Sequence, residues 1–78
     1  MNKERLIEEM VLSTDISKKL YGLLEKVFEY KDTIENIIIM LKNDRNKQKM
    51  IDFLESGETN KDRIYYRTAE LNRGISLL

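Results

Sequence analysis

The sequence predicts an all-α fold: a small bundle of three or four helices with a long N-terminal helix, in a single domain spanning residues 1–78. Apolar residues recur at alternating spacings of four and three over much of the chain, as they do along one face of a helix, and proline is absent. The period-two alternation of an amphipathic strand is missing. Because the chain contains neither an internal repeat nor a low-complexity linker, we expect one domain.

The longest stretch of helical spacing runs from residue 16 to residue 41 without interruption. Apolar residues further upstream lie on nearly the same stripe, so the first helix is expected to begin near Lys3. Residues 13–15 could instead cap a new helix, because short oxygen-bearing side chains accept hydrogen bonds from free N–H groups. The unbroken spacing favours a continuous helix there. Near residues 32–35, which match a capping box, both one long helix and a turn stay open.

Two shorter helices are expected in the second half of the chain. Residues 42–49 carry no apolar side chain over more than two helical turns, and Asn and Asp favour turns, so the chain should reverse around residues 43–46. The apolar segment that follows ends at Gly57, which suits a left-handed C-terminal cap. A capping signature at residues 59–62 then opens a last helix that ends near Gly74.

The run of five apolar residues at positions 37–41 covers more than half of the helix circumference. It therefore needs cover on several sides. A central helix of the bundle would provide that cover, and an interface with another chain is the alternative. The residues expected in the core are Leu20, Leu23, Val27, Ile34, Ile37, Leu41, Ile51, Leu54, Ile64 and Leu71.

Composition argues against several classes of function. The 78 residues contain no His and no Cys, so the usual acid–base, thiol and zinc chemistry lacks its side chains. We expect neither an enzyme nor a cofactor, and no small-molecule substrate. The 14 basic and 14 acidic residues cancel, which gives no overall attraction to nucleic acid or to an anionic membrane. No apolar run approaches a membrane span, and a cytoplasmic protein is the expectation.

The leading hypothesis is a small non-enzymatic protein-interaction module: a regulator, adaptor or inhibitor that presents an apolar helix face to another protein or to its own copy. A core of this size rarely supplies more than about 3–5 kcal/mol, and disulfides are impossible here, so self-association could complete the bundle. Large side chains that the core pattern does not use are candidates for the contact, since aromatic rings are enriched at interfaces. These candidates are Tyr21, Phe28, Tyr65, Tyr66 and Leu77.

The alternative is a small DNA-binding regulator. Residues 47–73 resemble in outline a helix-turn-helix, because two helical segments flank a short turn that contains glycine. The second helix would then read the major groove, and residues 42–49 would add positive charge near the phosphates. Four acidic residues crowd the same region and would repel phosphate. The side chains expected to contact DNA are Asn60, Lys61, Arg63 and Arg67.

Overall fold

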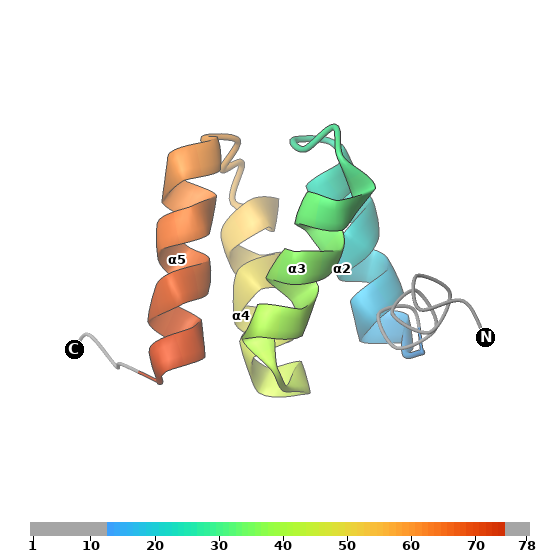
Figure 1. The fold of residues 1–78 in the computed structure, drawn as a ribbon, viewed down its shortest axis with the longest axis vertical. Helices are drawn as coiled ribbons and strands as arrows, with labels where there is room; N and C mark the ends of the chain where they lie inside the picture. Colours follow the sequence, from blue (N-terminus) through green and yellow to red (C-terminus); the bar gives the residue numbers. More distant parts are fainter. Residues whose placement is uncertain (1–12, 75–78) are drawn as a thin grey trace.

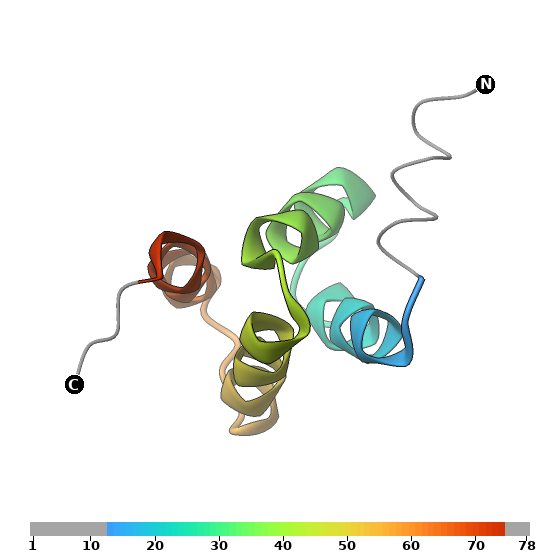
Figure 2. The ribbon, with the colours of Figure 1, turned by 90° about the horizontal axis from the view of Figure 1, so that it is seen from below.

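The computed structural model describes residues 13–74, which form four α-helices and no strand. The helices are α2 (Asp15–Glu25), α3 (Lys31–Leu41), α4 (Asp44–Glu55) and α5 (Lys61–Arg73). Successive helices run in opposite directions, so that α2 and α4 begin at the lower end of the bundle and α3 and α5 begin at its upper end (Figure 1). Viewed along the helices, α2 and α5 occupy opposite corners, as do α3 and α4 (Figure 2). The prediction of an all-α bundle is confirmed.

Three of the helices begin where a short polar side chain caps the backbone. Each of these side chains lies just before its helix and accepts a hydrogen bond from a backbone N–H three residues later, which satisfies one of the free donors of the first turn. The pairs are Thr14 with Ser17 at 3.2 Å, Asn43 with Asn46 at 2.8 Å, and Asn60 with Arg63 at 3.1 Å. These positions confirm the helix start expected at residues 59–62. The chain reverses at residues 42–43, at the edge of the turn expected around residues 43–46, because Asn43 caps α4 and residues 44–46 are already helical.

The expected long N-terminal helix is wrong for the described residues. A helix starts at Asp15 after the cap at Thr14, and it ends at Glu25 after 11 residues. The start expected near Lys3 lies outside the described residues. Tyr30 has extended backbone angles and makes no side-chain cap, so α3 starts one residue before the capping box that the sequence suggested. A straight helix over residues 16–41 would be about 39 Å long and could not fold back on itself. Two short antiparallel helices instead bury Leu20, Ile34, Ile37 and Leu41 of that stripe.

Most of the expected core is confirmed. Leu20, Ile37, Leu41 and Ile64 are at most 2 % exposed, and Ile34, Ile51, Leu54 and Leu71 also lie in the core. Two expected residues, Leu23 and Val27, are only partly buried. Their places are taken by the next residue along the chain. Within α2 the inward face carries Ser17, Leu20 and Leu24, and the helix ends at Glu25 before the chain reaches Phe28. The core residues that were not expected are Leu24, Phe28, Ile38 and Met50.

A glycine follows each of α4 and α5, at the positions where the sequence predicts that these helices end. Gly57, after α4, has φ of 101°, and Gly74, which caps α5, has φ of 69°; both lie in the left-handed region that glycine adopts at no steric cost. Lys42, after α3, also has a positive φ, of 71°. This non-glycine residue is held there by a turn in which Asn43 N–H donates to the Leu41 carbonyl at 2.8 Å. The tight turn places α4 immediately after α3.

Two polar contacts fix the helices relative to one another at the lower end. The side-chain amide of Asn46 on α4 donates to the carbonyl of Leu41 at 2.9 Å and to the carbonyl of Leu71 at 3.2 Å, which joins the ends of α3 and α5. Lys47 Nζ donates to the fully buried Ser17 Oγ at 2.9 Å and joins α4 to α2. Within residues 13–74, no helix is both long enough and apolar enough to cross a bilayer.

Candidate protein-binding surface

The five side chains expected to bind a partner do not form one face. Phe28 is 5 % exposed and belongs to the core, so it is not free to contact another chain, and its assignment to a binding face is revised. Tyr21 is partly buried against the core. Tyr65 and Tyr66 are 47 % and 66 % exposed on α5. Leu77 lies outside the described residues.

Tyr65 and Tyr66 project from α5 into different surroundings, because adjacent helical residues point about 100° apart. Tyr65 lies on the side of α5 that faces α3, where its ring packs against Phe28 with the centroids 5.3 Å apart and the planes tilted by 59°. Tyr66 lies beside a pocket that also contains Phe53 of α4. The two tyrosines therefore belong to two separate surfaces on either side of α5.

The surface between α3 and α5 is a shallow groove, and all the described residues that line it are uncharged. Its walls come from four residues of α3 and two residues of α5. They are Thr33, Asn36, Ile37, Met40, Tyr65 and Thr68. Met40 is 40 % exposed at the lower part of this groove, and Tyr65 is exposed on the opposite wall. In a chain with 36 % charged residues, a groove lined only by uncharged residues avoids the cost of desolvating charges when a partner binds.

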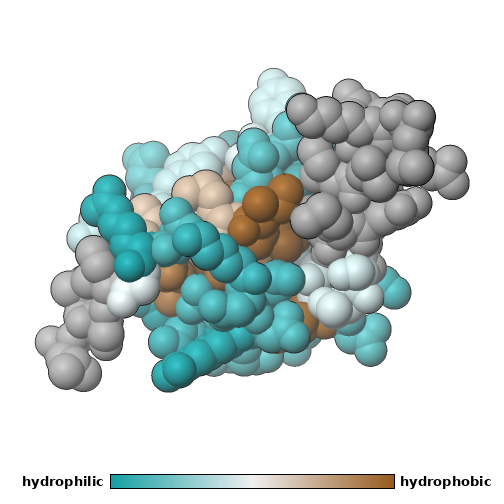
Figure 3. Space-filling model, turned by 60° about the horizontal axis from the view of Figure 1, so that its bottom comes forward, coloured by the Kyte–Doolittle hydropathy of each residue, from teal (hydrophilic) through white to brown (hydrophobic). Residues whose placement is uncertain are grey.

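The apolar character extends to the lower end of α3. Ile37, Ile38 and Leu41 are buried, as expected for a central helix, but Ile39 is 43 % exposed. The view from the lower side shows hydrophobic surface in the middle of a mostly hydrophilic face (Figure 3). Ile39 is the residue before Met40 on α3, but it does not line the groove. The five-residue apolar run is thus covered by the bundle at three positions and open at two.

The pocket between α4 and α5 has the opposite character. Phe53 and Tyr66 supply its apolar part, and four charged residues surround them: Asp62, Arg63, Arg67 and Glu70. Arg63 Nε lies 3.2 Å from a Glu58 carboxylate oxygen, and an Arg67 guanidinium nitrogen lies 3.9 Å from a carboxylate oxygen of Glu70. Arg63 and Arg67 thus each lie near a carboxylate of the same chain, although the buried Nε of Arg67 has no hydrogen-bond partner among the described residues.

The same ion pairs bear on the helix-turn-helix interpretation. Of the four side chains expected to contact DNA, Asn60 caps α5, and Arg63 and Arg67 are paired with carboxylates. Arg67 is also partly buried. Lys61 is exposed in the first turn of α5, beside the equally exposed Asp62. A phosphate would have to displace the internal carboxylates, which lowers the gain from each contact.

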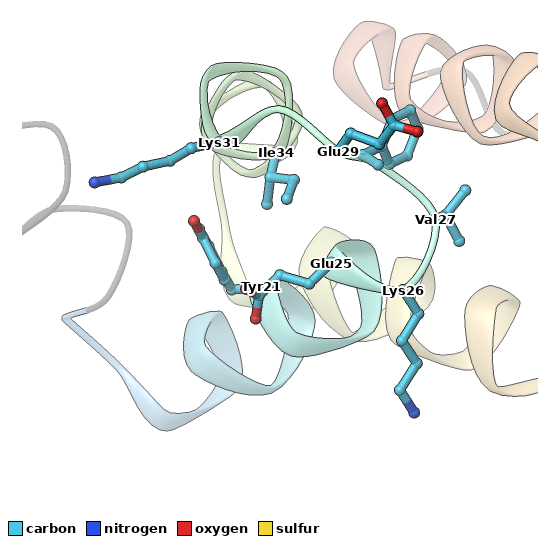
Figure 4. A pocket seen from close by; sticks show the side chains of 8 residues that line it. Tyr21, Glu25, Lys26, Val27, Glu29, Lys31 and Ile34 are labelled. Carbon is cyan, nitrogen blue, oxygen red and sulfur yellow. The ribbon is translucent and has the colours of Figure 1, made fainter.

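A third pocket lies beside the turn between α2 and α3 and is lined by mixed charges. Figure 4 shows that its charged side chains do not converge: Lys26 points down and away from the pocket, whereas Lys31 extends to the opposite side and Glu29 points toward α5. Tyr21 and Ile34 line the space between the two helices (Figure 4). Without converging charges, the pocket has no arrangement that would orient a small polar ligand.

One pair of side chains resembles a catalytic arrangement in composition alone. Ser17 Oγ and Lys47 Nζ are 2.9 Å apart, which is the distance expected between a nucleophile and its base. Ser17 is fully buried and also accepts a hydrogen bond from the Thr14 hydroxyl at 2.9 Å, so no substrate can reach it in this structure. In residues 13–74, the side chains that bind metals do not gather in any group of three or more. The pair therefore serves to join α2 and α4.

Sequence reasoning missed Thr33, Asn36, Met40 and Thr68 as members of a surface. The only available signal was the excess of apolar residues at positions 37–41, which indicated that part of this helix would lack cover. Pairing α3 with α5 is a tertiary property that no local pattern reports.

Comparisons with known proteins add nothing to this geometry: no family model matches the chain, and neither a curated protein nor a solved structure is similar to it.

Proposed function

We propose that this protein is a small non-enzymatic interaction module, a regulator, adaptor or inhibitor, that binds another protein chain through the groove between α3 and α5. The observation that carries the proposal is the uncharged lining of that groove, next to the exposed side chains of Met40 and Tyr65. Aromatic residues and methionine are enriched where proteins meet, and charged residues are depleted there. Cytoplasmic action remains an expectation from the sequence.

The other pockets support binding less well. The α4–α5 pocket presents four charged side chains, and its two arginines lie near carboxylates of the same chain, so an incoming chain would have to desolvate these charges. Binding in the α3–α5 groove would not require the desolvation of charged lining residues. Burial of its apolar side chains gains roughly 25 cal/mol for each Å² removed from water.

The experiment is affinity capture of the tagged protein from lysate of its source organism, using two pairs of matched variants. In the first pair, Met40→Lys places a charge in the groove, whereas Ile39→Lys places the same charge on the neighbouring residue, which is 43 % exposed and outside the groove. In the second pair, Tyr65→Lys alters the groove and Tyr66→Lys alters the charged pocket. Thermal melting followed by circular dichroism confirms that each variant is folded.

The proposal predicts that Met40→Lys and Tyr65→Lys lose a stoichiometric protein partner that Ile39→Lys and Tyr66→Lys retain. Equal retention by all four folded variants would contradict it. Nuclease treatment and salt titration test the DNA-binding alternative in the same experiment: recovered DNA that is lost steeply with salt, together with loss on Lys61→Ala, would favour the helix-turn-helix interpretation.

A further inference from the structure

The connection between α3 and α4 holds one residue in a strained backbone conformation. Since α3 ends at Leu41 and α4 begins at Asp44, only two residues reverse the chain at the lower end of the bundle (Figure 1). Lys42 has φ of 71° and ψ of −44°, and the Asn43 N–H donates to the Leu41 carbonyl at 2.8 Å. This combination describes a γ-turn with positive φ at its centre, a conformation that is rare and strained. Lysine has a Cβ, so it does not adopt positive φ as freely as glycine does.

The strain would disappear if α3 continued into α4. The two residues of the connection are neither glycine nor proline, so both can take the negative φ of a helix. In a continuous helix the Arg45 N–H would donate to the Leu41 carbonyl, which now accepts from the Asn43 N–H and the Asn46 side-chain amide. The helix would extend over residues 31–55, about 37 Å, and would hold α2 and α5 far apart.

The two helical hairpins, α2–α3 and α4–α5, depend on each other for burial. Helix α2 packs on α4, and α3 packs on α5. The buried apolar residues of all four helices form one cluster. Lys47 of α4 donates to Ser17 of α2 at 2.9 Å, and the rings of Phe28 and Tyr65 pack together across the two hairpins. A hairpin that separated from the other would therefore expose its share of the core, and the complementary surface would be available only in a second copy of the chain.

We propose that two copies of this chain form a domain-swapped dimer, in which α2–α3 of one copy packs on α4–α5 of the other. Residues 42–43 are the hinge: they open into the continuous helix, and the contacts between the hairpins form again between the copies. The swap releases the strain at both hinges and needs no new interface. Short connections under strain favour this form of assembly. Because two chains lose their independent motion, the swapped dimer is expected at high protein concentration.

The swap would change how many partners one particle can hold. Each α3–α5 groove would be built from α3 of one copy and α5 of the other, so the dimer would carry two identical grooves. Two grooves on one particle raise the effective concentration for the second binding event. The inference itself is independent of what the groove binds, because it rests on the hinge and on the contacts between the hairpins.

The first test compares Lys42→Gly with Lys42→Ala, two variants that lose the same charge. Each full chain is unfolded, then refolded at about 1 µM and at about 1 mM, and its molar mass is measured by light scattering. The unmodified protein and Lys42→Ala should form dimer at the higher concentration. Lys42→Gly should dimerise roughly 100-fold more weakly, because glycine accepts positive φ without strain and disfavours the continuous helix at both hinges. Thermal melting at the lower concentration confirms that each variant is folded.

The second test distinguishes the swapped dimer from an ordinary one. Lys19 Nζ lies 3.4 Å from a Glu55 carboxylate oxygen, and this ion pair joins α2 to α4. A carbodiimide couples the two groups directly into an amide. Unmodified protein and a copy labelled with heavy nitrogen are mixed, unfolded, refolded at the higher concentration and coupled. In the swapped dimer, half of the Lys19–Glu55 links should join a light peptide to a heavy one in mass spectrometry. Lys19→Arg, which keeps the charge but does not form the amide, is the control.

The results decide the proposal without any captured partner, so its failure is distinguishable from failure of the proposed function. Mixed-label links in a dimer that Lys42→Gly suppresses would support the swap. A chain that stays monomeric at the higher concentration would overturn it. So would a dimer whose links always join peptides of the same label, or a Lys42→Gly dimer as strong as that of Lys42→Ala.

Discussion

The two surfaces on either side of α5 differ in how their polar groups are satisfied. On the α4 side, Arg63 and Arg67 approach carboxylates of the same chain, and the charged residues surround a small apolar centre. On the α3 side, the groove lining contains no charge among the described residues, and Met40 and Tyr65 are half exposed. Two neighbouring pockets that both border α5 can therefore differ in how readily a partner binds them. The pocket on the α4 side carries charged side chains that lie near carboxylates of the same chain, and the groove on the α3 side has apolar side chains that are still exposed.

The largest effect is expected from the floor of the uncharged groove. Ile37 is 2 % exposed and belongs to the core, so Ile37→Ala should cost roughly 2–4 kcal/mol of unfolding free energy through lost burial and the cavity left behind. Phe53→Ala, under the charged pocket, should cost less because Phe53 is only partly buried. Chemical denaturation of both variants measures the difference. If Phe53→Ala were the more destabilising, the two surfaces would not differ in how deeply they reach into the core.

The next effect concerns the contact that holds α3 and α5 together at the lower end. Asn46→Ala removes the amide that donates to the carbonyls of Leu41 and Leu71, and it should cost roughly 1–3 kcal/mol because those carbonyls lose a partner. Hydrogen exchange should become faster at the ends of α3 and α5 and change little in α2. Unchanged exchange at both ends would show that packing alone sets the width of the groove. Gln48→Ala, an exposed amide of the same helix, serves as the control.

A smaller effect is expected at the start of α5, which borders both surfaces. Asn60→Ala removes the side chain that accepts the Arg63 N–H at 3.1 Å, and a lost cap typically costs about 1 kcal/mol. Asn60→Asp keeps an acceptor at the same position and should retain most of the stability. Equal melting temperatures for Asn60→Ala and the unmodified protein would show that tertiary contacts, and not the cap, determine where α5 begins.

The smallest effect is expected from the ion pair beside the charged pocket. Arg63→Gln breaks the contact with Glu58 and should change the unfolding free energy by about 0.5 kcal/mol or less, since the Arg63 side chain is 68 % exposed and Glu58 keeps the hydrogen bond that it accepts from the Asn60 N–H. The difference from the unmodified protein should shrink further in about 0.5 M salt. A loss comparable to that of Asn60→Ala would show that this pair contributes to the fold and not only to the chemistry of the surface.

Much of the fold follows from local chemistry. Asn43, Gly57 and Gly74 mark turns and helix ends in the structure as the sequence predicts, because capping and left-handed backbone depend on a few neighbouring residues. Eight of the ten expected core residues are buried for a similar reason: the apolar spacing reports which side of a helix avoids water. The exceptions, Leu23 and Val27, lie near the end of α2. The apolar spacing of four and three continues past this end, so the spacing alone does not reveal the turn.

The candidate site follows much less from the sequence. The sequence marks Tyr65 as a large side chain that the core pattern does not use, but nothing in the order of residues shows that it shares a groove with Met40, 25 positions earlier, or that Phe28 is used in the core beneath it. Those relations arise when α5 packs against α3, and they depend on the angle and spacing of two helices that are not adjacent in the chain. The sequence alone determines the helices, most of their inward faces and the balance of charge. The packing of the helices decides which uncharged residues meet, because it brings together side chains that lie far apart in the chain.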